Sequence, residues 1–351
     1  MKKSIILEAL LCALVIQGLM ATGAQQKTGG PQLTGFNLGH LNSTAHLLAF
    51  VAKEEGFFQE EGLDAVLTQF SSAGELVAGL ESGKLDAAFV GSVPAVTFQS
   101  QGHDVSIFGG AMTNGHGFVI KPEFTKGLTS WDITILKGRN VASVKNSVQD
   151  YELLVLLDKA GLDRNTDVNI VYFDSQRDAF AALQNREIDA ASVYSPYASL
   201  AKGQGYEVVY YCNEEDVFAD QPCCRQLALT SALREKPGFY EAFERALIKA
   251  YKFSQENHTK TIDDVAKYID INRDYIEYEV YGGHSVSKPD PDKQATIALK
   301  KGVVAFGYTN DYDIEALYNT SIYKSALADL VKANPNDAIY KALQAHFDQY
   351  E

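Results

Sequence analysis

Hydrophobic positions recur along the chain in two periods, and together they predict strands that alternate with helices. Short apolar runs typical of buried strands cover residues 32–38, 65–70, 86–90, 138–144, 168–173 and 189–194. The helical period covers residues 44–55, 73–82, 148–160 and 176–186, while Pro94 and Pro196 open two further helices. Strands that alternate with helices predict parallel sheets with right-handed crossovers.

Part of this pattern is an internal repeat. Residues 70–105 align with residues 173–208 at a constant offset of 103 without a gap, and 13 of the 36 positions are identical. The matches include the Asp-Ala-Ala runs at 86–88 and 189–191. A repeat of this length exceeds a solenoid unit, so it predicts two lobes built on one plan.

The rest of the chain fits a two-lobe α/β fold. Residues 114–121 are expected to cross from the first lobe to the second, and residues 226–230 to return. Lobe 1 then comprises residues 31–115 and 225–351, and lobe 2 comprises residues 116–224. Residues 236–351 read as a mostly helical tail on lobe 1, with amphipathic stretches at 239–255 and 262–269. The Pro-Asp-Pro-Asp run at 289–292 predicts an exposed turn.

Composition and charge exclude several classes of protein. The 351 residues are 46% hydrophobic and 22% charged, which is globular composition. Lys and Arg number 31 against 45 Asp and Glu, so the net charge is −14. Such a balance disfavours nucleic-acid binding and adhesion to anionic lipid. No apolar run reaches the roughly 18–20 residues of a membrane span.

The first 24 residues read as a secretory signal. Lys2 and Lys3 precede an apolar stretch to about Met20, and small residues precede the expected cleavage after Ala24. A buried first helix is the alternative. Cys12 does not fit the pattern of a lipoprotein cysteine. We therefore expect export to the periplasm, with a mature charge of −15 after two Lys and one Glu are lost.

Three cysteines follow the signal, and an odd number predicts no complete disulfide framework. They are Cys212, Cys223 and Cys224. The adjacent pair has three interpretations: buried structural residues, residues that line a ligand site, or a redox or soft-metal site. No C-x-x-C or H-x-x-x-H spacing supports a preformed metal site, so neither a metal nor a cofactor is predicted.

Ligands of open α/β sheets bind at the carboxyl ends of strands, where helices begin. Ser72 and Ser147 open capping-box patterns there, and helix starts offer free N–H groups to an anionic or polar ligand. The same serines could simply cap their helices. His46, His116 and Arg225 also fall in these segments.

Aromatic residues Tyr151, Tyr194 and Tyr197 are candidates for a wall with a polar edge, or for ordinary core. The chain contains no G-x-S-x-G, Walker, H-E-x-x-H or G-x-G-x-x-G motif. No nucleophile–base pair is legible from the sequence, so no enzyme activity is predicted.

Four segments together resemble a known family. These are the run from His46 to Asp64 (HLLAFVAKEEGFFQEEGLD), the Leu-Asp-Ala-Ala run at 85–88, residues 141–162 and the helix opening at 233–239. They resemble the nitrate/sulfonate/taurine-type solute-binding proteins of ABC importers, a family that includes binders of thiamine-pyrimidine precursors. The resemblance covers roughly residues 33–270.

The resemblance implies a two-lobe venus-flytrap fold of the type II periplasmic binding proteins, here with a helical C-terminal extension. It implies a monomer without catalytic activity that captures a small sulfonate-, nitrate- or pyrimidine-like solute by hinge closure. The partners would be the permease and ATPase of an importer, with peripheral contact at the membrane. The family's ligand contacts fall on His46, Ser72, Gly74, Ser92, Asn114, Ser147, Val148, Tyr194 and Pro196. The residues themselves add His116, Cys223, Cys224 and Arg225 as candidates.

The chain departs from the family pattern at two places. Tyr194-Ser195-Pro196 stands where many members have an aromatic residue, Glu and Pro, and many lack the Cys-Cys pair. Both departures leave the solute open, and the loss of a carboxylate favours an anion or a neutral heterocycle. Two alternatives stay open: an enzyme on the same scaffold, of the pyrimidine-precursor or menaquinone-pathway type, and a thiol-dependent metal-binding protein.

Overall fold

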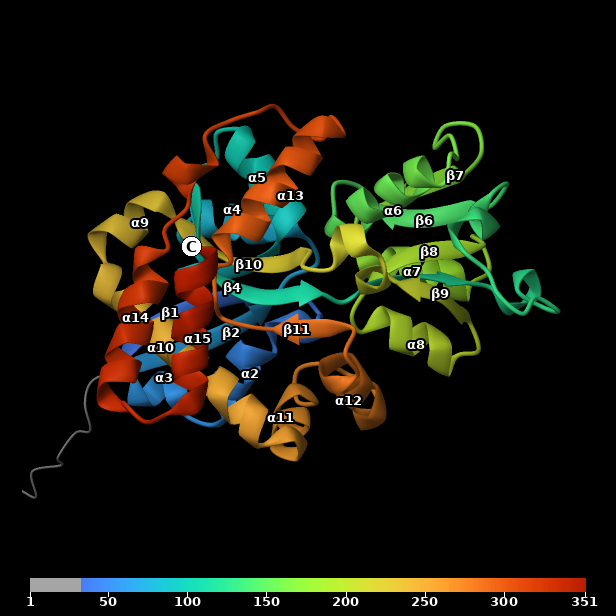
Figure 1. Ribbon diagram of the computed structural model, residues 1–351. Coiled ribbons are helices and arrows are strands. Elements are labelled where there is room, and N and C mark those ends of the chain that lie inside the picture. Colours follow the sequence, from blue (N-terminus) through green and yellow to red (C-terminus); the bar gives the residue numbers. More distant parts are fainter. Residues whose placement is uncertain (1–32) are drawn as a thin grey trace, which may run out of the picture. The chain divides into compact units, whose positions relative to one another are not determined.

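The chain forms two sheets, each made of parallel strands next to antiparallel ones. The computed structural model describes residues 33–351, and the predicted signal lies outside them. The first sheet has the strand order β11-β4-β10-β3-β1-β2 and the second β7-β6-β8-β5-β9 (Figure 1). The first consists of β1 (Thr34–His40), β2 (Leu63–Gln69), β3 (Ala87–Gly91), β4 (Val105–Asn114), β10 (Pro222–Leu229) and β11 (Ser285–Ser287). The second consists of β5 (His116–Ile120), β6 (Asn140–Val144), β7 (Asn169–Phe173), β8 (Ala190–Tyr194) and β9 (Glu207–Tyr211).

The two copies of the internal repeat form strands and helices in the same order, with the same strand pairing, in the two sheets. In the first, β1 pairs in parallel with β2 and β3, and β10 runs antiparallel to β3. In the second, β6 pairs in parallel with β7 and β8, and β5 runs antiparallel to β8. Helix α4 (Ala73–Glu81) and helix α7 (Gln176–Gln184) lie at the offset of 103, as do β3 and β8. The two-sheet α/β architecture predicted from the repeat is confirmed.

Helices follow the strands of each sheet where the hydrophobic pattern predicts them. In the first half these are α2 (Leu47–Glu54), α3 (Phe57–Glu60) and α5 (Ser92–Ser100), with a 3-10 turn, η1, at Thr44–His46. In the second half they are α6 (Val148–Lys159) and α8 (Tyr197–Gly203), with short 3-10 turns at Pro122–Phe124, Ile133–Leu136, Cys212–Glu214 and Asp216–Phe218.

The chain passes between the sheets twice. The first passage is Gly115, which separates β4 from β5 and has a φ of 87°, a conformation that suits glycine. The second passage precedes Pro222, because β10 is already paired with β4 from that residue onward. The return strand thus starts four residues before the predicted 226–230 segment.

The tail is mainly helical and packs largely on the first sheet. Its helices are α9 (Thr230–Glu235), α10 (Pro237–Glu256), α11 (His258–Val265), α12 (Arg273–Tyr281), α13 (Lys293–Ala305), α14 (Ser321–Ala333) and α15 (Ala338–Tyr350), with a 3-10 turn at Ile314–Leu317. Helix α10 carries Phe243, which stacks on Phe36 of β1 with ring centroids 4.5 Å apart. Burial of such aromatic faces against the sheet is what holds the amphipathic helix in place.

The structure corrects two expectations about the tail. The Pro-Asp-Pro-Asp turn is buried rather than exposed, since Pro289 O accepts a hydrogen bond from Gly110 N on β4 at 2.7 Å and Asp290 is only 3% exposed. The tail also reaches the second half of the molecule, where Glu279 of α12 accepts a hydrogen bond from Ser199 N of α8 at 3.0 Å. The contact of Pro289 with Gly110 buries the turn and joins distant parts of the chain, and the hydrophobic period of a segment does not predict such a contact.

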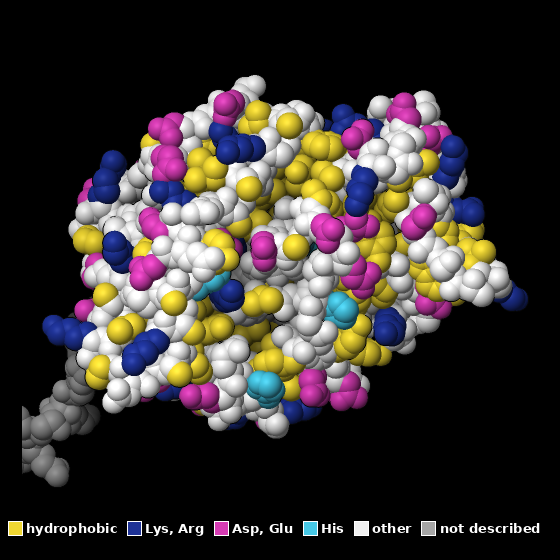
Figure 2. Space-filling view, in the orientation of Figure 1, with side chains coloured by type: hydrophobic (Ala, Val, Ile, Leu, Met, Phe, Trp, Pro, Cys, Tyr) yellow, Lys and Arg dark blue, Asp and Glu magenta, His cyan; other side chains and the backbone are white. Residues whose placement is uncertain are grey.

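Surface charge agrees with the composition. Figure 2 shows Lys and Arg scattered among Asp and Glu on the face in view, without a broad basic area. Among residues 33–351, no helix is both long enough and apolar enough to cross a membrane.

Candidate functional site

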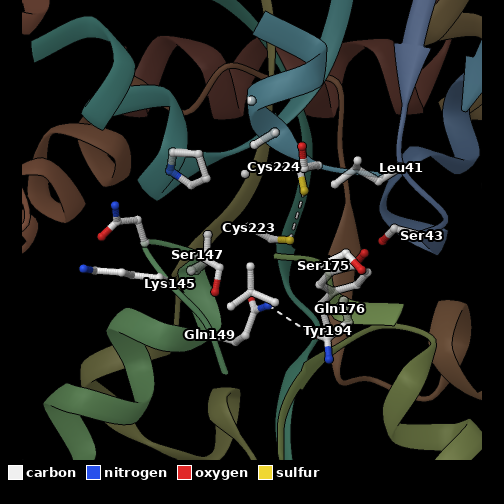
Figure 3. Close-up of a pocket in the computed structure, with 18 of the residues that line it drawn as sticks. Leu41, Ser43, Lys145, Ser147, Gln149, Ser175, Gln176, Tyr194, Cys223 and Cys224 are labelled. Atoms are coloured by element: carbon white, nitrogen blue, oxygen red, sulfur yellow. Dashed lines mark hydrogen bonds between the residues drawn. The ribbon is translucent and has the colours of Figure 1, made fainter. Parts of the chain in front are cut away.

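A cavity of about 280 Å³ is lined by residues from both sheets. Its walls come from the carboxyl ends of the parallel strands β1, β2, β3, β6, β7 and β8 and the residues that follow them, and from the first residues of β5 and β10 (Figure 3). The residues that line it are Leu41, Ser43, His46, Ser71, Ser72, Ala73, Gly74, Gly91, Pro94, Thr97, Phe98, Gln101, His116, Val144, Lys145, Asn146, Ser147, Val148, Gln149, Asp174, Ser175, Gln176, Tyr194, Cys223 and Cys224.

Three helices begin at this wall with a serine cap. Ser72, Ser147 and Ser175 each accept a hydrogen bond from the backbone N–H three residues ahead, at 3.2–3.3 Å. Helices α4, α6 and α7 keep their first N–H groups free of partners within the helix. The capping interpretation is therefore correct, and the same turns also bring partial positive charge to the cavity.

The starts of α6 and α7 are joined by a direct contact. Gln149 Nε2 donates to Gln176 Oε1 at 2.9 Å, and both amides line the cavity (Figure 3). Both residues lie at the starts of helices predicted over 148–160 and 176–186, but neither was among the predicted site residues. Their place in the first turn of a helix after a parallel strand is the signal that could have found them.

The remaining wall is largely apolar. Leu41, Pro94, Phe98 and Val148 contribute hydrocarbon surface, and Tyr194 adds an aromatic face. Burial raises the pKa of Tyr194 well above its usual range, so its hydroxyl stays neutral. Such a wall suits a ligand that has an apolar part.

Four of the thirteen predicted residues do not line the cavity: Ser92, Asn114, Pro196 and Arg225. Ser92 is buried as the first residue of α5, and Pro196 stands before α8. Asn114 turns to Ala219 O, to which its Nδ2 donates at 2.8 Å.

Arg225 needs a correction of its own. Its Nε donates to Thr296 Oγ1 of α13 at 3.2 Å, and Asp292 lies 3.8 Å from its guanidinium. Alternation along β10 sends this side chain to the face opposite the cavity. The guanidinium is therefore committed to the tail rather than offered to a ligand.

Both adjacent cysteines nevertheless line the cavity, and an irregularity of β10 accounts for this. Pro222 pairs with Thr113 and Cys224 with Met112, so Cys223 is the extra residue of a β-bulge. In a regular strand, two successive side chains would point to opposite faces. Their sulfur atoms lie 3.2 Å apart, and the two thiols are free (Figure 3).

A buried His–Glu pair continues from the cysteines. His116 Nε2 lies 3.2 Å from Cys223 Sγ, and His116 Nδ1 lies 3.1 Å from Glu152 Oε1 of α6. Burial works against protonation of His116, but the negative charge and hydrogen bond of Glu152 prevail and raise its pKa above the usual value. Glu152 was not among the predicted site residues, although a carboxylate inside the apolar face of a predicted helix is a signal in itself.

The described residues do not include a group of three or more His, Cys, Asp or Glu side chains arranged to hold a metal ion.

The two halves also touch beside the cavity, where Ser43 Oγ donates to Ser195 O at 2.9 Å. Ser43 lies in the loop after β1 and Ser195 directly follows β8. This contact joins the two walls across the site.

Comparison with known proteins agrees with this fold. The family described as NMT1-like matches residues 29–270. A Bacillus subtilis protein named for the binding of aliphatic sulfonates is 28% identical over 287 residues, which cover 79% of this chain and 81% of that protein.

Two solved structures show the same fold. The periplasmic nitrate-binding protein NrtA of Synechocystis is 16% identical, with a TM-score of 0.74 over 92% of this chain and all of that chain. The periplasmic aliphatic sulphonate-binding protein SsuA of Escherichia coli is 19% identical, with a TM-score of 0.67 over 82% of this chain and 92% of that chain. Both neighbours are binding proteins. Since the family match covers more than half of its residues, the chain belongs to the NMT1-like family.

Proposed function

We propose that the protein is the solute-binding component of an ABC importer and that it captures a small organic anion in the cavity between its two sheets. The observation that carries this proposal is the convergence of three serine-capped helix starts, from both sheets, on one cavity. Free N–H groups and the positive end of each helix dipole favour an anion.

The composition of the wall refines the class of anion. Among the residues that line the cavity, Lys145 and Asp174 carry permanent charges of opposite sign. The rest of the wall consists mainly of hydrogen-bond donors and apolar residues. An alkanesulfonate, which joins an anionic head to an apolar chain, fits both parts. Nitrate lacks the apolar part, so we expect it to bind more weakly. The named relatives that bind sulfonates and nitrate support the class.

Capture is proposed to proceed by closure of the two predicted lobes, with residues 222–224 counted in the first lobe because β10 pairs within the first sheet from Pro222 onward. Gly115 and the segment before Pro222 are the connections that would bend. The ligand contacts both lobes, stabilises the closed form and is shielded from water. We further propose export to the periplasm, action as a monomer, and docking of the closed form on a permease whose ATPase drives import.

A pair of glycine variants tests the site. Gly74 and Gly238 are each the second residue of a helix, α4 and α10, and a Cβ at either position meets no atom closer than 3.9 Å. Gly74 lines the cavity whereas Gly238 is exposed elsewhere. Gly74→Trp should fill the cavity, and Gly238→Trp is the matched control for the same change in helix propensity.

Titration calorimetry with the full chain provides the measurement. Butanesulfonate should bind with saturable heat, nitrate more weakly, and butylammonium not at all. We expect Gly74→Trp to abolish sulfonate binding and Gly238→Trp to retain it. Preferential binding of the cation, or equal affinity of the two tryptophan variants, would overturn the proposal.

A further inference from the structure

We propose that Cys224 and Cys223 form a reactive dithiol in the cavity and that it reduces small organic disulfides by thiol–disulfide exchange. This activity goes beyond solute capture and does not depend on it. Three observations carry it: the two sulfur atoms in contact, a histidine–carboxylate pair behind them, and their place in the wall of a cavity.

The four groups form one continuous chain of contacts. Glu152 Oε1, His116, Cys223 Sγ and Cys224 Sγ follow one another at 3.1, 3.2 and 3.2 Å. All four residues are at most 7% exposed. A nucleophile next to a base, which a third group in turn orients, is the arrangement that activates a thiol. A separate observation adds to these contacts, which is that both thiols line the wall of the cavity.

The proton arrangement assigns a role to each thiol. With His116 protonated, we assign Nδ1–H as the donor to Glu152, Nε2–H as the donor to Cys223 Sγ, and the Cys223 thiol as the donor to Cys224 Sγ. The hydrogen bond from Cys223 lowers the pKa of Cys224 well below its usual value, against the effect of burial. Cys224 is therefore the thiolate at the end of the chain, and Cys223 carries the proton.

Other groups near the dithiol also affect the two thiols. His46 lines the cavity beside Cys224 and also lowers the pKa of that thiol. Its Nε2 is buried and has no hydrogen-bond partner among the described residues. Burial, the contact with Cys224 and the charge of Glu152 raise the pKa of Cys223 well above its usual value, and Arg225 opposes them, while Tyr194 faces both sulfur atoms as a neutral phenol. The thiolate thus has positive or neutral neighbours on the side of the cavity.

The exchange balances in two steps. The Cys224 thiolate attacks one sulfur of R–S–S–R′, a Cys224–S–S–R bond forms, and R′–S⁻ leaves with the electron pair of the broken bond. That thiolate takes the Cys223 proton, which His116 replaces. Cys223 then passes its proton to His116 and attacks Cys224 Sγ, so that R–S⁻ leaves and takes the proton from His116. The substrate is reduced to two thiols while the dithiol is oxidised to a disulfide.

Sequence adjacency makes the oxidised form reversible. Neighbouring Cα atoms lie about 3.8 Å apart, whereas the Cα atoms of ordinary disulfides are about 4.4–6.8 Å apart. A disulfide between adjacent residues is consequently strained and has a high reduction potential, so the dithiol reduces only disulfides of still higher potential, such as an activated aromatic disulfide. The pair is suited to exchange with small molecules rather than to a structural cross-link.

The test uses 4,4′-dithiodipyridine as a small disulfide, with release of thiopyridone followed by absorbance and the product weighed by mass spectrometry. Every protein in the test carries Cys12→Ser, because the full-length chain would otherwise present a further thiol. The Cys12→Ser protein, which serves as wild type here, should release two thiopyridones, lose two hydrogen atoms and retain no adduct. Cys223→Ser should release one and keep a mixed disulfide on Cys224. Cys224→Ser should react at least about tenfold more slowly. Cys212→Ser is the control for a buried thiol outside the cavity that also faces Glu152, and it should release two thiopyridones as wild type does.

Glu152 is a positioning residue, and the pH profile separates its role from a structural one. Glu152→Gln should keep the fold by circular dichroism but move the rise of the reaction rate upward by about one pH unit or more. An unchanged profile would contradict the proton arrangement. The proposal is overturned if wild type stops at one thiopyridone with a stable adduct, or if Cys224→Ser reacts as fast as wild type.

Discussion

Asp290 offers a test of how the tail is held on the first sheet. Its carboxyl group is buried beside β4, where Oδ1 accepts from Asp292 N at 2.9 Å and Oδ2 lacks a hydrogen-bond partner among the described residues. Burial raises its pKa from 3.8 to about 6, and the charge of Asp292 adds to this while Arg225 and Lys288 oppose it. A shift of this size corresponds to about 3 kcal/mol.

The sign of the effect follows from proton binding. The folded protein holds the Asp290 proton more tightly than the unfolded chain, so the group stabilises the fold below about pH 4. That contribution is lost as the pH rises through about 6. Asn cannot ionise, so Asp290→Asn should have the stability of wild type at pH 4. It should be more stable by up to about 3 kcal/mol at pH 8.

Urea unfolding at intervals between pH 4 and pH 8 measures this difference. The two stability curves should diverge between about pH 4 and pH 6 and then run parallel. Asp158→Asn, a change at an exposed carboxylate of α6, should not diverge from wild type in this way. If the difference between Asp290→Asn and wild type is constant over the whole range, the carboxyl group does not titrate as argued.

Three further substitutions test other contacts that stabilise the fold. Gly110→Ala should lower the free energy of unfolding by about 2–4 kcal/mol, because its Cβ would lie 1.9 Å from a backbone oxygen of the loop before α13. Gly35→Ala, with open space around it, should change little in the same urea titration. Glu279→Ala should cost about 1–3 kcal/mol because it leaves Ser199 donors buried without an acceptor, and Glu279→Gln should restore most of that in thermal unfolding. Ser72→Ala should cost about 1 kcal/mol through the lost cap, and a calorimetric scan that shows no shift would contradict the capping geometry.

Local signals in the sequence were sufficient for most of the fold. Ser72 and Ser175 mark helix starts because their side chains bond to N–H groups only three residues away. The Asp-Ala-Ala runs identify β3 and β8 because buried parallel strands are short and apolar. Repetition of both signals at one offset was enough to predict two sheets on one plan.

The features that the sequence analysis missed depend on contacts between distant residues. His116 and Glu152 are 36 positions apart, and the pattern of neither segment predicts the other. The bulge at Cys223 depends on how β10 pairs with β4, and it also decides that Arg225 turns away from the cavity. The turn at 289–292 is buried only because a glycine on β4 lets the loop approach.

Asp150 connects the first turn of α6 to a part of the chain beyond the family match. Its carboxylate accepts from Ser143 Oγ at 2.9 Å, from Asn146 N at 3.0 Å and from the Tyr308 hydroxyl at 2.9 Å. Tyr308 lies in the tail, outside residues 29–270. A chimera that grafted only the cavity walls of this protein onto a relative would leave the carboxylate without its third donor. The tyrosine has to be transplanted together with the loops.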